Sequence, residues 1–194
     1  DVPAIDSVMG VNYVDATGPV FFYGNPPSTA LVAASLNNAA CNPKPLQARP
    51  RIWIGGNGEK RTLRIAARHA DGWNTPYPSV EEFKRLSGVL DEWCEKEGRD
   101  PATIERNVNL SFHMAATPAH LDRTEQQYRE TWGPASEVMR GRGVVIGLPE
   151  QAIDLVGRFK DAGAARVNIA QRPPLDWDGL NAWAETVIPA FSPG

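Results

Sequence analysis

The sequence predicts an α/β fold in which helices cover a parallel sheet. From residue 51 onward, short apolar runs alternate with longer stretches whose apolar residues recur at helical spacing. Glycine, proline and aspartate separate these segments, as is typical between strands and helices. Strands that alternate with helices in this way indicate βαβ units, so we expect the strands to run parallel.

Residues 51–75 show the clearest strand–loop–helix–strand pattern. An apolar run at 52–54 ends at two glycines and predicts a buried strand, in which Trp53 belongs to the core. A helix follows, because apolar residues recur at i, i+3, i+4 and i+7, namely Leu63, Ala66, Ala67 and Ala70. Asp71 and Gly72 end the helix, and residues 73–75 begin a second strand.

A glycine-rich loop, Gly55, Gly56, Asn57 and Gly58, lies between that strand and that helix. Backbone N–H groups at a helix N-terminus favour anions, and Lys60 and Arg61 add positive charge nearby. A tight turn with positive φ explains the same glycines, so the local sequence fits a phosphate site and a structural turn equally well. The spacing matches neither G-x-G-x-x-G nor a Walker A loop, which disfavours a Rossmann or P-loop protein.

The rest of the chain continues the alternation. The predicted elements before residue 148 are a helix capped by Ser79, a strand over 108–114, polar surface helices or a lid within 119–140, and a short strand or extended connection at 144–147. They are followed by a helix starting at Pro149, a strand at 167–169 and a final helix capped by Asp176 or Asp178. In the final helix we expect Leu180, Trp183, Val187 and Ile188 to face inward, and Trp93, Trp177 and Trp183 to pack on helices.

Residues 1–50 follow a different pattern. A strand is favoured over 20–23, residues 29–35 fit a strand or a helix start, and 42–45 resemble an extended linker. We therefore predict an irregular N-terminal segment over 1–50 and a βα domain over 51–194. The first residue is aspartate rather than methionine, so we expect a cut N-terminus or a partial sequence.

Composition excludes several functional classes. The net charge of −3 with no basic stripe disfavours nucleic acid as a partner, and no apolar run approaches the ~20 residues of a membrane span. Two cysteines, Cys41 and Cys94, form neither a disulfide framework nor a metal site with three scattered histidines. We therefore predict a cytoplasmic protein with reduced thiols and no metal.

Several motifs, in their order along the chain, resemble the luciferase-like monooxygenase superfamily, and especially its coenzyme F420-dependent oxidoreductases. The strongest is residues 54–63 followed by 66–74, the glycine loop and its helix. The others are the segment from Asn37 to Gln47, Gly147-Leu148-Pro149-Glu150-Gln151, and residues 162–169. The resemblance covers residues 36–191 and does not extend to residues 1–35.

The resemblance implies a TIM-like (β/α)8 barrel, which takes about 250 residues. The chain supplies about four βα units, the C-terminal half of that pattern, so the resemblance implies a partial barrel. An open half barrel exposes sheet edges and an apolar inner face. We therefore expect a homo-oligomer or a separate N-terminal half to complete it.

The resemblance also assigns roles to residues. Gly55, Gly56, Asn57 and Gly58, with Lys60 or Arg61, would bind the phosphate of FMN or the phosphate-bearing tail of F420, and Asn74 and Thr75 would lie at the same rim. His113 is a weak catalytic candidate, since a hydrogen bond to a neighbour explains it as well. Arg172 is a weak candidate for an anionic substrate, with a surface salt bridge as the alternative. Of the other histidines, His69 is expected at a helix end and His120 in solvent.

Three functional hypotheses follow. The first is an oxidoreductase that uses F420 or FMN for hydride transfer to or from a small organic substrate. The second is a non-catalytic partial barrel, a fragment or remnant with no cofactor. The third is a βα protein that binds sugar phosphates without preference for a flavin ring.

Overall fold

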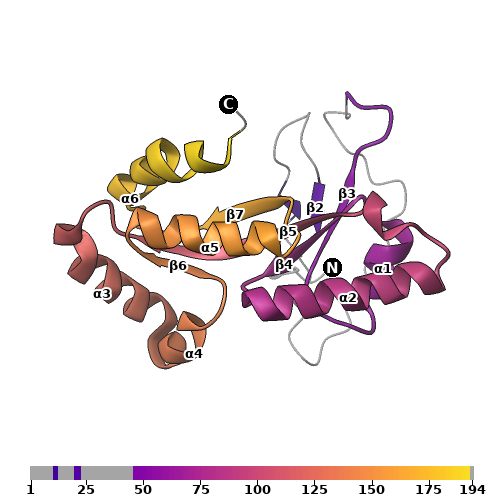
Figure 1. Ribbon diagram of the computed structural model, residues 1–194, viewed down its shortest axis with the longest axis horizontal. Coiled ribbons are helices and arrows are strands. Elements are labelled where there is room, and N and C mark those ends of the chain that lie inside the picture. Colours follow the sequence, from indigo (N-terminus) through magenta and orange to yellow (C-terminus); the bar gives the residue numbers. More distant parts are fainter. Residues whose placement is uncertain (1–10, 13–19, 23–45, 193–194) are drawn as a thin grey trace, which may run out of the picture. The chain divides into compact units, whose positions relative to one another are not determined.

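The computed structural model describes residues 11–12, 20–22 and 46–192. The strands are β1 (Val11–Asn12), β2 (Val20–Phe22), β3 (Ile52–Gly55), β4 (Gly72–Pro76), β5 (Glu105–Met114), β6 (Val144–Gly147) and β7 (Arg166–Ala170). The α-helices are α1 (Thr62–His69), α2 (Val80–Lys96), α3 (Leu121–Trp132), α4 (Ser136–Arg140), α5 (Pro149–Asp161) and α6 (Trp177–Ala182) (Figure 1). A π-helical turn over Trp183–Val187 continues α6, and 3-10 turns lie at Pro101–Thr103, Pro118–His120, Gly133–Ala135 and Pro189–Phe191.

This order confirms the predicted alternation of strands and helices. Every strand predicted from residue 51 onward is present, and β2 confirms the strand favoured near residue 20. The parallel strands form an α/β sheet that does not close into a ring among the described elements, which confirms a partial barrel. The segment 29–35 and Cys41 lie outside the described residues, and the domain boundary near residue 50 stays a prediction.

The chain divides into two compact units. The first comprises residues 1–74 and 89–104, and the second comprises residues 75–88 and 105–194. Each unit is described separately below. No helix in the described ranges has both the length and the apolar character that crossing a bilayer requires.

In the first unit, β3 pairs parallel with β2 and β4, and β1 pairs antiparallel with β2. The predicted apolar face of α1 is fully buried, with 0% exposure at Leu63, Ala66, Ala67 and Ala70. Trp53 is 1% exposed, which confirms it as a core residue. It pairs with Gly72, where any Cβ would overlap the indole ring, so the glycine makes room for the tryptophan.

The C-terminal part of α2 holds the glycine loop and α1 in place. The indole Nε1 of Trp93 donates to the carbonyl oxygen of Glu59 at 2.8 Å. The carboxylate of Glu97 accepts from Arg64 at 2.8 Å and lies 3.2 Å from Arg68. These contacts connect residues about 30 positions apart and fix the start of α1 against the end of α2.

In the second unit, β5 is the central strand, and its two edges have different partners. Backbone groups of odd-numbered residues face one edge, where the Asn109 oxygen accepts from Tyr77 N–H and Ser111 N–H donates to Gly143. The even edge faces β7, since Ala165 N–H donates to the Arg106 oxygen. Strand β6 thus shares an edge with the segment that follows β4, and β7 lies on the opposite edge.

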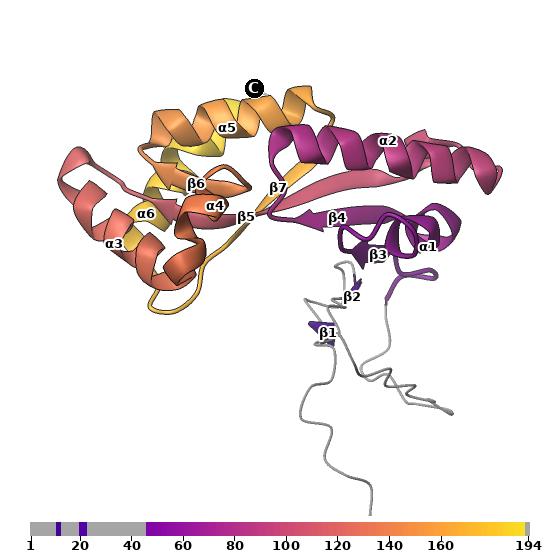
Figure 2. The same cartoon turned by 90° about the horizontal axis from the view of Figure 1, so that it is seen from below.

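The two faces of β5 have opposite characters, as the period-2 pattern predicts. Val108, Leu110, Phe112 and Met114 are each 0% exposed on one face. The ring of Phe112 packs edge-on against Trp183, with centroids 5.7 Å apart, so α6 and its π-helical turn cover that face. Figure 2 shows α5 on one side of β5 and β6 and the pair α3–α4 on the other. His113 points toward α3, where its ring packs against Tyr128.

Both predicted caps are confirmed, but the final helix differs from the prediction. Ser79 Oγ accepts from Glu82 N–H at 3.0 Å, and Asp176 accepts from Gly179 N–H at 3.2 Å. Ile188, predicted to face inward, is 52% exposed, whereas Val187, at the end of the π-helical turn, is 1% exposed. Trp177 was predicted to pack on a helix, yet it is 64% exposed at the first turn of α6.

Candidate functional site

The glycine loop after β3 is fixed by backbone contacts to β4. Gly56 has φ +126° and its N–H donates to the carbonyl oxygen of Asn74 at 3.0 Å. The Trp73 indole N–H donates to the carbonyl oxygen of Gly56 at 2.8 Å. At Gly58 a Cβ would lie only 2.8 Å from Thr62 Oγ1. The backbone therefore explains why both positions are glycine. Gly56 has a positive φ angle, and Gly58 packs too closely on Thr62 for a Cβ atom.

The same loop leaves donors available at the start of α1. Four backbone N–H groups donate no hydrogen bond within the described residues, those of Gly58, Lys60, Arg61 and Thr62. The N-terminus of α1 has no side-chain cap and no acidic residue in its first turn. Acidic residues occupy the first turn of every other α-helix described. The start of α1 is thus the most electropositive of these helix termini, and it fits a phosphate group.

The remaining predicted loop residues divide into exposed and buried groups. Lys60 and Arg61 are exposed beside the loop. The side chains of Asn74 and Thr75 are buried, at 1% and 0% exposure. Asn74 contributes its backbone carbonyl oxygen, which accepts from the Gly56 N–H and so positions the loop. A direct contact of either side chain with a cofactor remains a prediction.

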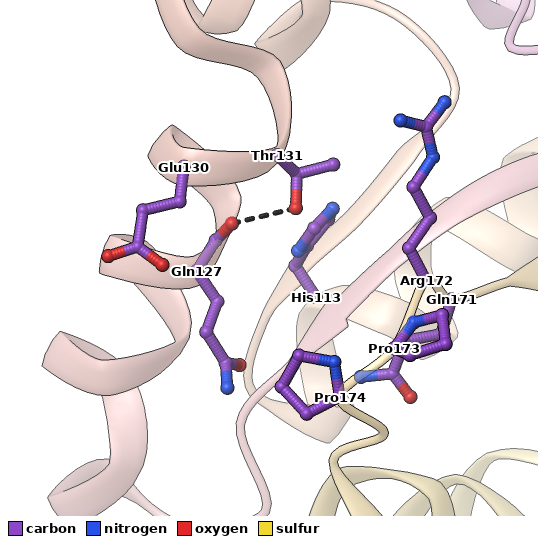
Figure 3. A pocket seen from close by; sticks show the side chains of 8 residues that line it. All are labelled: His113, Gln127, Glu130, Thr131, Gln171, Arg172, Pro173 and Pro174. Carbon is purple, nitrogen blue, oxygen red and sulfur yellow. Dashed lines mark hydrogen bonds between the residues drawn. The ribbon is translucent and has the colours of Figure 1, made fainter.

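A pocket in the second unit lies between α3 and the carboxyl ends of β5 and β7 (Figure 3). Its volume is about 350 Å³. The lining residues are His113, Gln127, Glu130, Thr131, Gln171, Arg172, Pro173 and Pro174. Active sites of barrel and parallel-sheet enzymes occupy this end of the strands, so the pocket is a candidate active site.

His113 lines this pocket from the polar face of β5. It is 8% exposed, its Nε2 lies 2.9 Å from Ser111 Oγ, and its ring packs edge-on against Tyr128. Burial lowers the pKa of His113 to about 4, although the Glu125 carboxylate acts in the opposite direction. The imidazole is therefore neutral at pH 7 and can donate from one nitrogen while it accepts at the other. The predicted hydrogen bond to a neighbour is confirmed, and a catalytic role remains a hypothesis.

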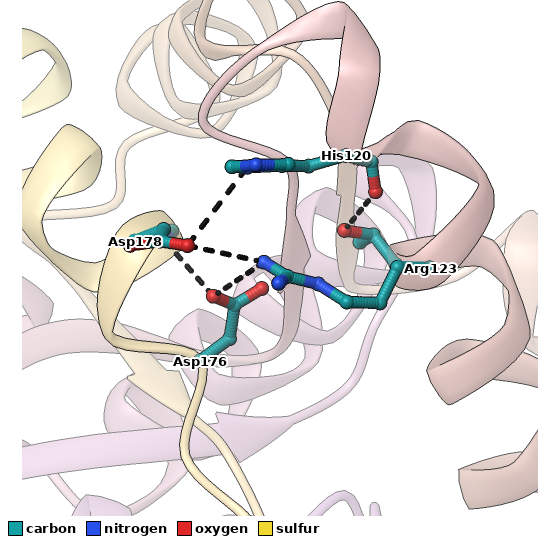
Figure 4. Close-up of polar contacts among 6 residues, drawn as sticks. His120, Arg123, Asp176 and Asp178 are labelled. Carbon is teal, nitrogen blue, oxygen red and sulfur yellow. Dashed lines mark hydrogen bonds and ion pairs between the residues drawn. The ribbon is translucent and has the colours of Figure 1, made fainter.

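Helix α3 covers His113 and is itself held by two groups of contacts. In the first, the Tyr128 hydroxyl donates to the carbonyl oxygen of Ser136, and the Arg140 guanidinium lies over the Tyr128 ring and pairs with Glu125. In the second, Arg123 pairs with Asp176 at 3.4 Å and with Asp178 at 3.3 Å (Figure 4). Both groups fix the wall of the pocket that α3 provides.

His120 belongs to the second group of contacts, contrary to prediction. We expected it in solvent, but the residue is half-buried and its Nδ1 lies 4.0 Å from Asp178 Oδ2. The 3-10 turn that precedes α3 brings it toward the start of α6 (Figure 4). His69 lies at the end of α1, as expected.

Arg172 lies at the pocket with no protein partner. Arg61 and Arg172 are the two arginines of the described ranges that make no ion pair, side-chain hydrogen bond or ring contact with the protein. The alternative that Arg172 forms a surface salt bridge therefore finds no support within the described residues. Each of these arginines adjoins one of the two predicted ligand sites.

Sequence reasoning missed six of the eight residues that line the pocket. Gln127, Glu130 and Thr131 lie on the polar helix α3, whose sequence gives no sign of which residues face inward. Gln171 directly follows β7, so its position at a strand end was the available signal. Its side-chain oxygen is buried without a hydrogen-bond donor.

No metal site was found in the part of the chain that the structure describes, where no three His, Cys, Asp or Glu residues converge. Cys94 is a buried cysteine that forms no disulfide within the described residues. The groups that the two candidate sites offer a ligand include backbone amides, the neutral His113, Arg61 and Arg172.

Comparison with known proteins identifies related sequences and folds. A profile of the family described as luciferase-like monooxygenase matches residues 32–136, more than half of the chain. A search of curated protein sequences returned no match. Among solved structures, an F420-dependent secondary alcohol dehydrogenase in complex with an F420-acetone adduct is similar, with a TM-score of 0.65 and 18% identity over 91% of this chain and 57% of that one.

Two further structures resemble the chain in the same way. The coenzyme F420-dependent tetrahydromethanopterin reductase from Methanopyrus kandleri has a TM-score of 0.56 and 16% identity, over 74% of this chain and 51% of that one. A long-chain alkane monooxygenase has a TM-score of 0.57 and 19% identity, over 77% of this chain and 42% of that one. At these identities the likeness concerns the fold, and the chain spans about half the length of these proteins.

Proposed function

Because the chain belongs to the luciferase-like monooxygenase family, we propose that it forms part of an oxidoreductase that uses coenzyme F420 or FMN. The reaction class is hydride transfer to or from a small organic substrate. The single observation that supports a cofactor site most strongly is the uncapped start of α1, with its available backbone donors and with Lys60 and Arg61 beside it. Similar structures include F420-dependent enzymes and the oxygenating constituent of 3,6-diketocamphane monooxygenase in complex with FMN, which is why the proposal names both cofactors.

In this proposal the glycine loop binds the phosphate of the cofactor. The backbone N–H groups of Gly58, Lys60 and Arg61 would donate to phosphate oxygens, and the two basic side chains would offset the charge. Gly56 has a different role, because its N–H is already bonded to Asn74. It sets the turn that lets the loop approach an anion without a Cβ in the way.

His113 would act on a substrate proton. When bound, the cofactor supplies a ring that accepts or donates hydride. The protein must then hold the substrate, exclude water and accept or return a proton. His113 is neutral and can take up a proton, but its pKa of about 4 makes it a weak base, and its Nε2 is already paired with Ser111.

The proposal extends to location and assembly. We propose a cytoplasmic protein that pairs with a second copy or with another half barrel. The relatives' greater length supports the second possibility, since this chain spans about half of each. A non-catalytic partial barrel is the competing hypothesis, and it is supported by the purely structural reasons for Gly56 and Gly58.

Cofactor titration tests the proposal directly. FMN and oxidised F420 are added separately to the folded protein, and binding is followed by fluorescence. We expect saturable binding of at least one of them. If neither binds to protein that circular dichroism shows to be folded, the cofactor hypothesis is wrong for this chain. Binding of simple sugar phosphates without preference for the flavin ring would instead support the third hypothesis.

A loop variant shows whether the binding depends on the predicted site. Gly56→Asp places a carboxylate on a residue with φ +126°, so repulsion and loop distortion should weaken cofactor binding by at least about tenfold. The matched control is Gly163→Asp, which adds the same charge at a glycine with φ +96° and no atom near its Cβ position. Equal affinities for both variants would mean that the loop is only a turn.

A further inference from the structure

We propose that Ser111 holds His113 in the tautomer that carries its hydrogen on Nδ1, and that this N–H donates to the carbonyl oxygen of a small molecule in the pocket between α3 and the ends of β5 and β7. The inference deepens the proposed function, and it rests on that function only where it takes the small molecule to be the substrate. The tautomer depends on the protein alone. It follows from the hydrogen-bonding needs of Ser111 and from the surroundings of the second imidazole nitrogen.

The Ser111 hydroxyl has a single acceptor for its hydrogen. Ser111 is 4% exposed, and its Oγ lies 2.9 Å from His113 Nε2. Among the residues that the structure describes, no other group binds this hydroxyl. If Nε2 carried the hydrogen and donated to Oγ, the hydroxyl hydrogen would be left without an acceptor in a buried position. Buried donors without an acceptor are rarer in proteins than buried oxygens with an unused lone pair, so the hydroxyl is the donor.

This hydrogen bond decides where the imidazole carries its own hydrogen. A neutral imidazole has one N–H and one lone pair, and a hydroxyl that donates to Nε2 requires the lone pair there. The N–H is then on Nδ1. Burial keeps the ring neutral at pH 7, since it disfavours the charged form. Free histidine favours the opposite tautomer, so an effect of the protein can be recognised.

The second nitrogen of the ring, Nδ1, is accessible. It has no hydrogen-bond partner among the described residues, yet it is not one of the fully buried polar atoms that lack a partner. It therefore keeps exposed surface, and His113 lines the pocket of about 350 Å³. Figure 3 shows the imidazole between Thr131 and Arg172, which also line the pocket. An N–H at this position can bind an acceptor oxygen of a ligand.

A carbonyl oxygen is the acceptor that suits this donor in the proposed reaction. With a pKa of about 4, His113 seldom takes up a proton at pH 7, so it is better suited to holding an oxygen than to removing a proton. A neutral donor that is already in position stabilises negative charge on a substrate oxygen without giving up its own hydrogen. In this role Ser111 is a positioning residue, because it acts through His113.

NMR of the full chain labelled with ¹⁵N measures the tautomer at pH 7. The protein contains three histidines, and His113→Phe identifies the signals of His113 by their loss. We expect Nδ1 to carry the hydrogen in most molecules of the folded wild type. A wild type that is mostly in the Nε2–H form overturns the proposal.

A serine variant shows whether the hydroxyl sets the tautomer. Ser111→Ala should return His113 toward the Nε2–H form. The matched control is Ser87→Ala, which removes a buried hydroxyl from α2 that does not line the pocket and should leave the tautomer unchanged. The same tautomer in wild type and in folded Ser111→Ala would show that Ser111 does not position the ring.

Cyclohexanone, a small carbonyl compound without a hydrogen-bond donor, tests the binding. Titrated into the wild type without cofactor, it should bind saturably and shift the His113 Nδ1 signal. His113→Phe should bind it about threefold to tenfold more weakly. No saturable binding, or equal affinity of the two proteins, overturns the carbonyl site.

The cofactor titration is a separate measurement on the same protein, so the two proposals can fail independently. If FMN or F420 binds while His113 is in the Nε2–H form, this inference is wrong and the oxidoreductase proposal stands. If the Nδ1–H form and cyclohexanone binding are found and neither cofactor binds, the donor site stands and the oxidoreductase proposal is wrong for this chain.

Discussion

The glycine loop of the first unit and the His113 pocket of the second contain the same rare feature, an arginine without a protein partner. The surroundings of the two arginines differ. Arg61 precedes a helix whose backbone N–H groups supply the other donors. Arg172 follows a strand and shares its pocket with side chains from α3 and β5. One candidate site is built from consecutive backbone, and the other is built from distant side chains.

This difference decides how each site tolerates change. A backbone site depends on φ angles and on the absence of Cβ atoms, so substitutions that distort the chain are the most harmful. A side-chain site depends on which groups reach the pocket, so conservative substitutions that keep the volume can remove a function without unfolding the protein. The following predictions use these two sensitivities.

The largest effect on stability is expected at Gly72, which pairs with Trp53 of the strand that leads into the glycine loop. Gly72→Ala places a Cβ inside the ring of Trp53, so it should lower the free energy of unfolding by about 1–3 kcal/mol or more. Chemical denaturation measures this change, and hydrogen exchange should show the loss of protection concentrated in β3 and β4. The control is Gly88→Ala on the exposed surface of α2, which meets no atom within 4 Å and should gain up to about 1 kcal/mol. Equal stability of the two variants would contradict the packing described for Trp53.

An intermediate effect is expected at the pocket as pH falls. The pKa of His113 is about 4 in the folded protein, below the ordinary value of 6.5, so the unfolded chain takes up this proton first. Above pH 6.5 the residue has no effect on stability. Between pH 6.5 and 4 it progressively lowers the free energy of unfolding, by about 2 kcal/mol at pH 5.

Comparison with His113→Gln isolates this contribution. Wild type and variant are unfolded with urea at pH 7.5 and pH 5. The wild type should lose about 2 kcal/mol more than the variant between these conditions, because the variant has no group to titrate there. Parallel losses in the two proteins would show that His113 does not titrate in a buried, neutral state.

The smallest effect on stability is expected for the two unpaired arginines. Arg61→Gln and Arg172→Gln each remove an exposed side chain without a protein partner, so each should change the free energy of unfolding by less than about 0.5 kcal/mol. Their effects on ligands should nevertheless differ, with Arg61→Gln weakening binding of the anionic cofactor and Arg172→Gln weakening binding of an anionic substrate. Thermal denaturation with and without each ligand measures both properties. A loss of stability in either unliganded variant would show that the arginine has a structural role.

The local pattern of the sequence was sufficient for most of the fold. The strands, the buried face of α1 and the caps at Ser79 and Asp176 all follow from residues within one or two helical turns of each other. The final helix was the exception. Trp183 and Val187 are buried as the helical period predicts, but Ile188, the next residue in the chain, is 52% exposed.

The candidate sites were predictable to different degrees. The glycine loop could be read directly, since all its groups are contiguous. His113 and Arg172 could be selected only as polar residues at strand ends, and α3 contributed Gln127, Glu130 and Thr131 with no warning in its polar sequence. Which face of such a helix points inward depends on the ion pairs of Arg123 and the packing of Tyr128, both of which are tertiary contacts.

By itself, the sequence determined the alternation of strands and helices, the positively charged glycine loop and the family, because these features are encoded by residues near one another in the chain. Only the tertiary structure decided that His113 is buried and neutral and that, among the residues the structure describes, the Gln171 oxygen has no donor and Arg172 has no partner. The physical reason is that desolvation and pairing depend on every neighbouring group. For this pocket those neighbours come from segments up to about 60 residues apart.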